Sequence, residues 1–283
     1  MKRTTIILLA GLLLAGCERN LPRADAPRPR AVCFSPAITA MLFEMGLEDH
    51  IVGVTTYCTV PEGLDIPVVG SQLNIRAEPI AAVDPDVLLT QTVPRRFETV
   101  RKLKPNITIE YVRIETLGDI AATMERIAAV LDRPEKGIAA RRRFEAKLAE
   151  VRRRVAGLAP RRALFVMGHR DPSVAGRDTF MNEMIEVAGG VNAAAAKYEG
   201  WKSVGVESIL KLAPEVIVCQ SGAAAADEAR RYWAELARSA GRNVRVHVVT
   251  DKRWTIPTGR MADPLADRMA DIIHPDSPRE AHP

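Results

Sequence analysis

Short apolar runs alternate along the chain with longer segments in which apolar residues recur every three or four positions. The runs occupy residues 31–34, 51–54, 87–90 and 107–111, and later residues 163–167, 216–219 and 244–249. Apolar runs of this length without polar alternation are typical of strands buried on both faces of a parallel sheet. The segments with helical spacing lie between them, at residues 35–46, 79–83, 94–104, 116–131, 179–188, 225–240 and 264–273. The pattern predicts an α/β fold.

One segment without proline divides this alternation into two halves. From Pro134 to about Gly157, an apolar stripe that includes Phe144, Leu148 and Val151 runs among many charged residues. Gly137 is the residue of this segment that least favours a helix. This spacing predicts a single long helix. We therefore expect two Rossmann-like lobes with parallel sheets, residues 31–133 and 158–283, joined by an inter-lobe helix at residues 134–157. Each lobe is long enough to bury its own core.

Two segments with similar sequences occur, one in each predicted lobe. Residues 78–89 and 207–218 match at an initial glutamate, an isoleucine, a proline, the acid that follows it and the apolar run after that. The match places Glu78 and Glu207 at equivalent positions at the start of a short helix. A helix dipole alone favours an acid there.

The first residues have the pattern of an export signal. A basic head is followed by an apolar run from Ile6 to Ala15, which is too short to span a membrane, and small residues precede Cys17. The pattern resembles the bacterial lipobox, which implies a signal peptide at residues 1–16 and a lipid on Cys17. Residues 17–30, with three prolines among charges, are predicted to be an extended tether. We expect a periplasmic protein anchored to a membrane by lipid.

Export would leave three cysteines in an oxidising compartment, so at least one thiol stays unpaired. Cys33 and Cys219 lie in predicted strands, where cysteine usually acts as a small buried apolar residue. Cys58 follows a strand, and both a plain loop thiol and a pairing with Cys33 stay open.

Composition and charge narrow the classes of function. The 283 residues include 40 Lys or Arg against 35 Asp or Glu, and 5% are aromatic. The basic excess lies largely in the first thirty residues, which argues against a nucleic-acid binder with a basic stripe on its folded part. Common catalytic motifs are missing from the sequence, and its five histidines are dispersed. We expect a monomeric binding protein that is not an enzyme and has no resident metal or cofactor.

Candidate binding residues gather in the loops that follow strands, where open α/β sheets bind ligands. Two of the three tryptophans fall in or beside such loops, and Trp233, at helical spacing, is expected in the core. Aromatic side chains in loops offer rigid contact area for a bulky ligand. The predicted ligand-binding residues are Tyr57, Cys58, Gln72, Leu73, His169, Arg170, Ser173, Trp201, Arg253 and Trp254.

At these positions the chain resembles the periplasmic cobalamin-binding proteins and, more broadly, the cobalamin, siderophore and haem binders of ABC importers. The similar stretches are residues 35–47, 52–58, 78–89, 174–180, 188–192 and 206–218. The resemblance implies a class III periplasmic binding protein that holds its ligand between two lobes on one rigid helix. It implies that Tyr57 and Trp201 contact a corrin and that a residue near Trp254 closes the site. It also implies that Glu78 and Glu207 dock onto arginines of the permease.

The resemblance predicts an extracytoplasmic solute-binding lipoprotein that captures cobalamin or another corrinoid and delivers it to an importer permease and its ATPase. Two departures keep other ligands open: Gln72 and Leu73 stand where the family has a tryptophan, and His169 with Cys58 adds metal-ligating atoms. Haem or a ferric siderophore, the latter suited to Arg170 and Arg253, is the alternative ligand. A different hypothesis is an exported thiol enzyme in which His169 activates Cys58, which requires the two side chains within about 3–4 Å. We expect Tyr57, Trp201 and Trp254 to face one inter-lobe cleft, and Glu78 and Glu207 to lie exposed on the same side of the molecule.

Overall fold

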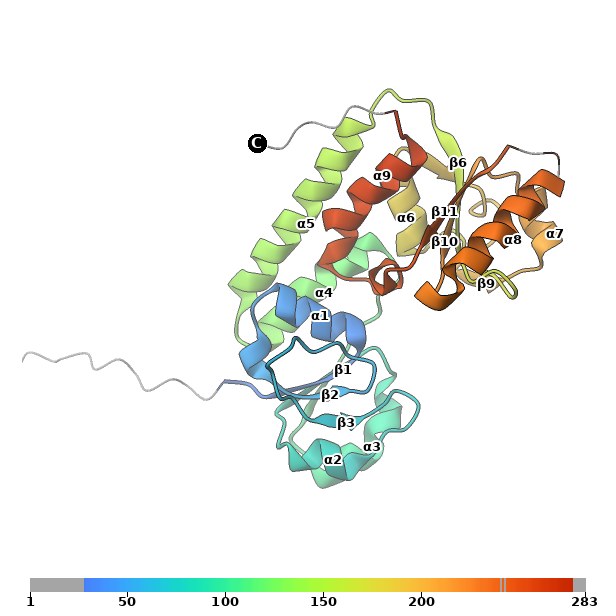
Figure 1. Ribbon diagram of the computed structural model, residues 1–283. Helices are drawn as coiled ribbons and strands as arrows, with labels where there is room; N and C mark the ends of the chain where they lie inside the picture. Colours follow the sequence, from blue (N-terminus) through green and yellow to red (C-terminus); the bar gives the residue numbers. More distant parts are fainter. Residues whose placement is uncertain (1–27, 240, 242, 277–283) are drawn as a thin grey trace, which may run out of the picture.

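The computed structural model describes residues 28–239, 241 and 243–276 (Figure 1). The predicted signal peptide, Cys17 and the tether up to residue 27 lie outside the described residues. Two α/β lobes are connected by two helices that pack side by side, α4 and α5. This arrangement confirms the predicted two-lobe α/β fold. Within the described residues, no helix is both long enough and apolar enough to cross a membrane.

The N-terminal lobe is built around a parallel sheet of five strands in the order β3-β2-β1-β4-β5. Ser35 caps the first helix through its side chain, and Pro36 occupies the first turn. The short strand β3 was not predicted. The elements are β1 (Ala31–Phe34), α1 (Pro36–Glu44), η1 (Glu48–His50), β2 (Ile51–Thr55), β3 (Val68–Gly70), α2 (Ala77–Ala82), β4 (Val87–Thr90), η2 (Pro94–Phe97), α3 (Glu98–Leu103) and β5 (Thr108–Tyr111).

Two antiparallel helices form the connection between the lobes. Helix α4 (Leu117–Val130) starts with a capping box in which Thr116 and Asp119 satisfy each other's backbone N–H groups. Helix α5 (Pro134–Arg154) is the predicted long helix. At Gly137 the helices touch so closely that an added Cβ would lie 2.7 Å from the Met124 carbonyl oxygen. The glycine that weakens the helix locally is therefore what lets α5 pack against α4.

The C-terminal lobe contains a six-stranded mixed sheet. Its strands β11, β10, β6 and β8 are parallel, whereas β7 pairs antiparallel with both β6 and β9. The sequence did not predict β7, β8 or β9. The elements are β6 (Arg161–Met167), β7 (Ser173–Ala175), α6 (Phe180–Val187), β8 (Gly190–Asn192), β9 (Trp201–Ser203), α7 (Val206–Lys211), β10 (Val216–Gln220), η3 (Ala223–Ala225), α8 (Ala226–Ser239), β11 (Arg245–Val249), η4 (Lys252–Thr255), η5 (Gly259–Met261), η6 (Ala262–Ala266) and α9 (Asp267–Ile273).

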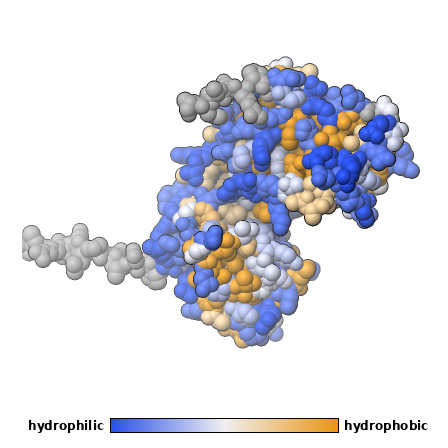
Figure 2. All heavy atoms as spheres, in the orientation of Figure 1, coloured by the Kyte–Doolittle hydropathy of each residue, from blue (hydrophilic) through white to orange (hydrophobic). Residues whose placement is uncertain are grey.

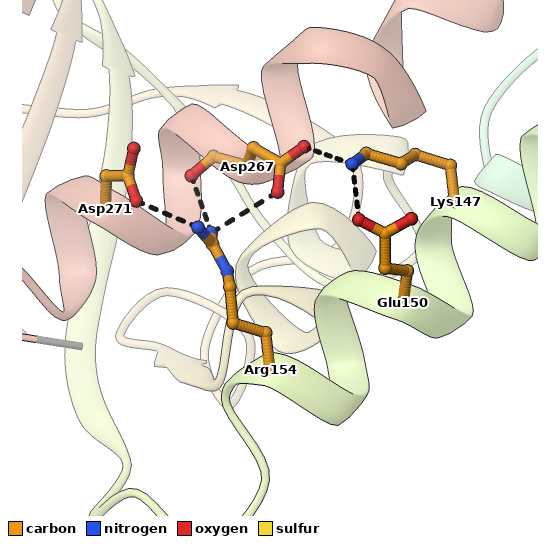
Figure 3. Close-up of polar contacts among 5 residues, drawn as sticks. All are labelled: Lys147, Glu150, Arg154, Asp267 and Asp271. Atoms are coloured by element: carbon orange, nitrogen blue, oxygen red, sulfur yellow. Dashed lines mark hydrogen bonds and ion pairs between the residues drawn. The ribbon is translucent and has the colours of Figure 1, made fainter. Parts of the chain in front are cut away.

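The C-terminal helix α9 is fastened to α5 by a group of ion pairs (Figure 3). Arg154 contacts Asp271 at 3.1 Å and donates to the Asp267 carbonyl oxygen at 3.0 Å. Lys147 lies 2.8 Å from carboxylate oxygens of both Asp267 and Glu150. The end of the chain is thus held against the inter-lobe helix.

The largest cluster of buried apolar side chains spans both lobes. It contains Ile38 and Leu89 of the N-terminal lobe, Phe144 of α5, and Phe165 and Ile273 of the C-terminal lobe. Smaller clusters lie on the outer face of each sheet. Each lobe thus buries apolar side chains of its own, and the largest cluster joins the two lobes through α4, α5 and α9.

Candidate functional site

A cavity of about 390 Å³ lies between the lobes. One wall is α1 with the loop after β2, and the other is the segment that follows β11. The lining residues are Pro36, Ala40, Phe43, Glu44, Thr59, Pro61, Arg253, Ile256, Thr258 and Arg260. Of the predicted binding residues, Arg253 lines this cavity directly.

The N-terminal lobe exposes apolar side chains in the segments that follow β2. Tyr57, just after β2, is 64% exposed, and Leu73, just after β3, is 82% exposed. Leu64 and Val68 are exposed as well. Figure 2 shows a broad apolar area on this lobe around the loop between β2 and β3. An exposed apolar patch of this kind marks a surface that contacts something other than water.

Hydrogen bonds hold the loop that presents Leu73. Ser71 and Asn74 bond each other's backbones in a turn, and Gln72 donates its Nε2 to the Phe34 carbonyl oxygen at 3.3 Å. Arg96 donates to the Gln72 carbonyl oxygen at 2.9 Å. Gln72 thus ties the loop to the end of β1, while Leu73 projects into solvent.

The C-terminal side presents charged groups that are already paired. His169, which is buried, lies with its Nε2 3.3 Å from Glu228 Oε1, and Arg170 Nη2 lies 2.6 Å from the same oxygen. The Arg170 hydrogen bond is the main reason that the pKa of Glu228 is lowered. Ser173 begins β7. These groups make a polar surface, in contrast with the exposed apolar side chains of the N-terminal lobe.

Arg253 is oriented by its neighbour Asp251. The Asp251 carboxylate caps η4 through the Arg253 backbone N–H at 2.9 Å and accepts from Arg253 Nε at 2.8 Å. The hydrogen bond from Arg253 lowers the pKa of Asp251. The guanidinium is therefore fixed beside the cavity.

The aromatic residues of this lobe form a stack around Phe165 on β6. Trp201, at the start of β9, is half-buried and meets Phe165 edge-on with ring centroids 6.1 Å apart. Trp254 stacks on the same ring at 6.2 Å and is only 1% exposed. The expectation that Trp254 faces the cleft is wrong, because the Asp251 cap turns η4 so that its indole packs into the core. Trp233 is buried, as predicted.

The thiols are buried or held by hydroxyl groups. Thr39 donates to Cys58 Sγ at 3.1 Å, and the Thr55 hydroxyl lies 3.1 Å from the same sulfur. Cys33 and Cys219 are fully buried, as predicted, and burial raises both pKa values, that of Cys219 to about 11. All three cysteines in the described part of the chain are free thiols.

The described residues bring no metal-type cluster together around Cys58 or His169. Across the described ranges, no group of three or more His, Cys, Asp or Glu side chains is placed to hold a metal ion. The partners of Cys58 are hydroxyls of the N-terminal lobe, and those of His169 are Glu228 and the Tyr232 ring of the C-terminal lobe. The contacts of the two residues thus lie in separate lobes.

Glu44 is an important cleft residue that the sequence did not reveal. It is the last residue of α1, and its carboxylate bonds the Thr258 hydroxyl, the Gly259 backbone N–H and Arg260. Arg260 Nε lies 3.3 Å from Glu44 Oε1. Burial is the main cause of its raised pKa. The partners lie more than 200 positions away, so no local sequence signal could have indicated this contact between the lobes.

Glu44 and Arg260 also lie between the inter-lobe cavity and a second cavity. The second cavity, of about 380 Å³, is lined by both residues and by Phe144 and Lys147 of α5. An added Cβ at Gly259 would lie 2.6 Å from Glu44 Oε2, so this glycine leaves room for the carboxylate. The ion pair therefore forms the inner wall of the inter-lobe cavity.

Glu78 and Glu207 occupy the same place in the two lobes. Each is the second residue of a six-residue helix, α2 or α7, and each is exposed. Figure 1 shows α2 at the far end of the N-terminal lobe and α7 at the outer edge of the C-terminal lobe. Both carboxylates are free to contact a partner that reaches both lobes.

Known proteins are similar to this chain in sequence. A family model described as periplasmic binding protein matches residues 32–248. The uncharacterized ABC transporter substrate-binding lipoprotein YvrC of Bacillus subtilis is 25% identical over 97% of each chain. A vitamin B12-binding protein of Vibrio cholerae is 27% identical over 84% of this chain and 86% of its own.

Solved structures of similar proteins share the fold. The periplasmic vitamin B12 binding protein BtuF of Vibrio cholerae superposes with a TM-score of 0.71, at 25% identity, over 87% of this chain and 97% of its own. The periplasmic heme binding protein HutB of Vibrio cholerae superposes with a TM-score of 0.75 over 87% and 99%, respectively. At 20% identity the second likeness is one of fold alone.

Proposed function

Because this chain belongs to the periplasmic binding protein family, we propose that it is the extracytoplasmic solute-binding lipoprotein of an ABC importer. It captures a bulky metal chelate, cobalamin or another corrinoid, between its lobes and delivers it to the permease. The family consists of solute-binding transport components and not of enzymes. We therefore set aside the Cys58–His169 thiol enzyme.

The contrast between the exposed side chains of the two lobes supports the ligand proposal. Tyr57 and Leu73 offer apolar area on one side, and Trp201, with its polar neighbours, lies on the other. A corrinoid has a broad, largely apolar ring system with polar amides around its edge, so it complements one apolar wall and one polar wall. The curated relatives named vitamin B12-binding proteins support the same ligand class.

Arg253 and Arg260 favour a second ligand class, haem or a ferric siderophore. Both arginines line the inter-lobe cavity. Guanidinium groups recognise carboxylates through paired hydrogen bonds, and these ligands carry acidic groups that a corrinoid ring lacks. The two classes are separated by the experiment below.

Delivery is proposed to use Glu78 and Glu207. Two exposed acids at equivalent places on separate lobes suit a permease with two-fold symmetry that presents a basic group to each lobe. The lipid on Cys17 would keep the protein at the membrane. In this proposal, reversing both charges with Glu78→Lys and Glu207→Lys abolishes uptake in cells but leaves ligand binding unchanged.

The test is retention of a coloured ligand by the purified chain. The chain from residue 17, carrying Cys17→Ser, is incubated with cyanocobalamin, hemin or a ferric siderophore, desalted, and examined by visible absorption and tryptophan fluorescence. We expect one equivalent of cyanocobalamin to be retained. Retention of hemin or siderophore instead would overturn the corrinoid proposal, and no retained ligand would overturn the transport proposal.

Trp201→Phe provides an internal control for where the ligand lies. Trp233 and Trp254 are at most 1% exposed, so Trp201 is the tryptophan with surface at the cleft. We expect ligand-dependent quenching to fall by more than half in this variant while one equivalent is still retained. Undiminished quenching would place the ligand away from Trp201.

A further inference from the structure

We propose that the outer face of α5 binds the anionic headgroups of a membrane surface. This face is defined by Arg142 and Arg153, whereas Arg143 lines the second cavity. Helix α5 contains eight Lys or Arg and three Asp or Glu, an excess of five positive charges. The rest of the chain has 32 residues of each sign, which is 40 less 8 and 35 less 3. Helix α5 alone therefore carries a positive excess as large as that of the whole chain, so the expectation that the basic excess lies largely in the first thirty residues overlooked a basic helix of the folded part.

Several basic residues of α5 are committed to internal ion pairs. Arg141 bonds Glu125 at 2.9 Å and Glu145 at 2.7 Å. Lys147 and Arg154 point toward α9, where they pair with acids (Figure 3). These side chains hold the structure together and are not available to a partner.

The outer face, by contrast, presents arginines without partners. Arg142 and Arg153 are exposed, and neither has an ion pair with any residue in the described ranges. Arg142 and Arg153 are eleven positions apart, so they lie almost on one line along the helix, about 16 Å from each other. Ala146 and Ala149 lie between them, so small side chains separate the cations. A flat anionic surface can approach both arginines together.

The membrane is the partner that the position of this face favours, a step that rests on the proposed lipid at Cys17. Arg28, where the described chain begins, pairs with Asp49 at 2.7 Å. Nearby, Lys136 in the first turn of α5 bonds the Gly46 carbonyl oxygen. The eleven residues from Cys17 to Arg28 span at most about 40 Å. A lipid on Cys17 therefore keeps α5, itself about 32 Å long, close to the headgroups.

This contact would hold the protein in an orientation in which it can bind ligand but does not contact the permease. Helix α5 runs along one edge of the molecule, while α7 lies at the opposite edge (Figure 1). With α5 on the lipid, the docking residue of the C-terminal lobe is turned away from the membrane and does not engage the permease. Each arginine near an anionic surface strengthens binding about fivefold, so two of them give a contact that is readily released.

The test is flotation of the chain from residue 17, carrying Cys17→Ser, with lipid vesicles. We expect binding to phosphatidylcholine vesicles containing 30% phosphatidylglycerol at 50 mM salt, and loss of binding at 500 mM salt. Arg142→Glu with Arg153→Glu should lower the bound fraction at least tenfold. The matched control is Arg231→Glu with Arg238→Glu, which makes the same charge change at exposed positions of α8 and should lower it less than threefold.

The outcomes separate this proposal from its rivals. No binding by the parent chain, equal binding to pure phosphatidylcholine, or equal loss in both double variants overturns it. Far-ultraviolet circular dichroism of each variant checks that it is folded. Cyanocobalamin retention is measured on the same samples, so failure of the ligand proposal is detected independently of vesicle binding.

Discussion

The two lobes follow the same succession of strands and helices but present opposite chemistry to the cleft. The N-terminal lobe exposes Tyr57, Leu64, Val68 and Leu73 around the loop that follows β2. On the C-terminal lobe, charged groups form pairs at the surface and the aromatic rings stack around Phe165. The shared order of strands and helices sets where each surface lies, and the segments that follow the strands set which side chains it exposes.

The difference arises from how the chain leaves the central strands. After β2 the chain makes a long loop with few partners, so its apolar side chains remain at the surface. After β6 it returns as β7, which pairs with β9 and brings Trp201 onto Phe165. The loop after β2 in the N-terminal lobe can therefore adjust its conformation, whereas the β7–β9 segment of the C-terminal lobe is supported by the core. A ligand would gain apolar contact from the first and orientation from the second.

Removing the support of the C-terminal wall should have the largest effect. Phe165→Ala deletes a fully buried ring that contacts both Trp201 and Trp254, and should lower the free energy of unfolding by about 3–5 kcal/mol. Tyr57→Ala, at the unsupported wall, should change it by less than about 0.5 kcal/mol. Urea unfolding followed by circular dichroism measures both. Similar losses in the two variants would contradict the contrast between the walls.

The contrast also assumes that the lobes keep one relative position, which depends on the contact between α4 and α5. Gly137→Ala should destabilise the protein by about 1–3 kcal/mol, because backbone atoms of α4 leave no room for a methyl group. Gly118→Ala, on the exposed face of α4 with ordinary contact distances, is the matched control and should not destabilise. Thermal unfolding compares them. If Gly137→Ala is neutral, the helices are not held as described.

Ligand affinity tests the adaptable wall directly. Tyr57→Ala should weaken cyanocobalamin binding about tenfold, and Leu73→Ala about threefold, in proportion to the apolar area that each side chain can cover. Arg170→Gln should change the affinity less than twofold, because Arg170 is exposed and already paired with Glu228. Isothermal titration calorimetry gives the dissociation constants. A larger loss for Arg170→Gln than for Tyr57→Ala would reverse the assignment of roles.

The smallest effects should appear in the pH dependence of stability. Acidification should strengthen the contribution of Glu44 in the N-terminal lobe and weaken that of Glu228 in the C-terminal lobe. The folded-state pKa of Glu44 is raised by burial, so its favourable contribution is fully present below its ordinary value and is lost as pH rises through the raised pKa. Stability relative to Glu44→Gln should therefore increase as pH falls from 7 toward 4.5. Glu228 has a lowered pKa from Arg170, so stability relative to Glu228→Gln should decrease as pH falls below its ordinary value.

Chemical denaturation at several pH values measures both differences. Because Glu228 is exposed, its effect should be the weaker of the two and should shrink further at high salt. A Glu44 difference that decreases on acidification would contradict its raised pKa.

Sequence patterns predicted those elements whose side chains carry a periodic signal. The buried runs of β1, β4 and β10 and the stripe of α5 are long enough for apolar spacing to show. Strands β3, β7, β8 and β9 have three residues each and include glycine, serine or lysine, so no alternation distinguishes them from loops. Tertiary pairing, and not local propensity, makes them strands.

The cavity lining was predictable where a segment follows a strand directly, as at Arg253. It was not predictable where a distant contact decides which way a side chain points. Trp254 lies in a correctly chosen loop but is turned inward by the cap at Asp251. Glu44 ends an ordinary helix, and its role comes from the segment at residues 258–260. Orientation and long-range pairing are properties of the assembled fold.

The shared core has a consequence for the order in which the protein can fold. Met269 and Ile273, close to the end of the described chain, belong to the same buried cluster as Ile38 and Leu89 near its beginning. A chain still emerging from the ribosome therefore lacks the side chains that complete packing around its first sheet. Folding of the shared core can finish only after residues 269–273 have been made, so the first sheet stays incompletely packed until late in synthesis.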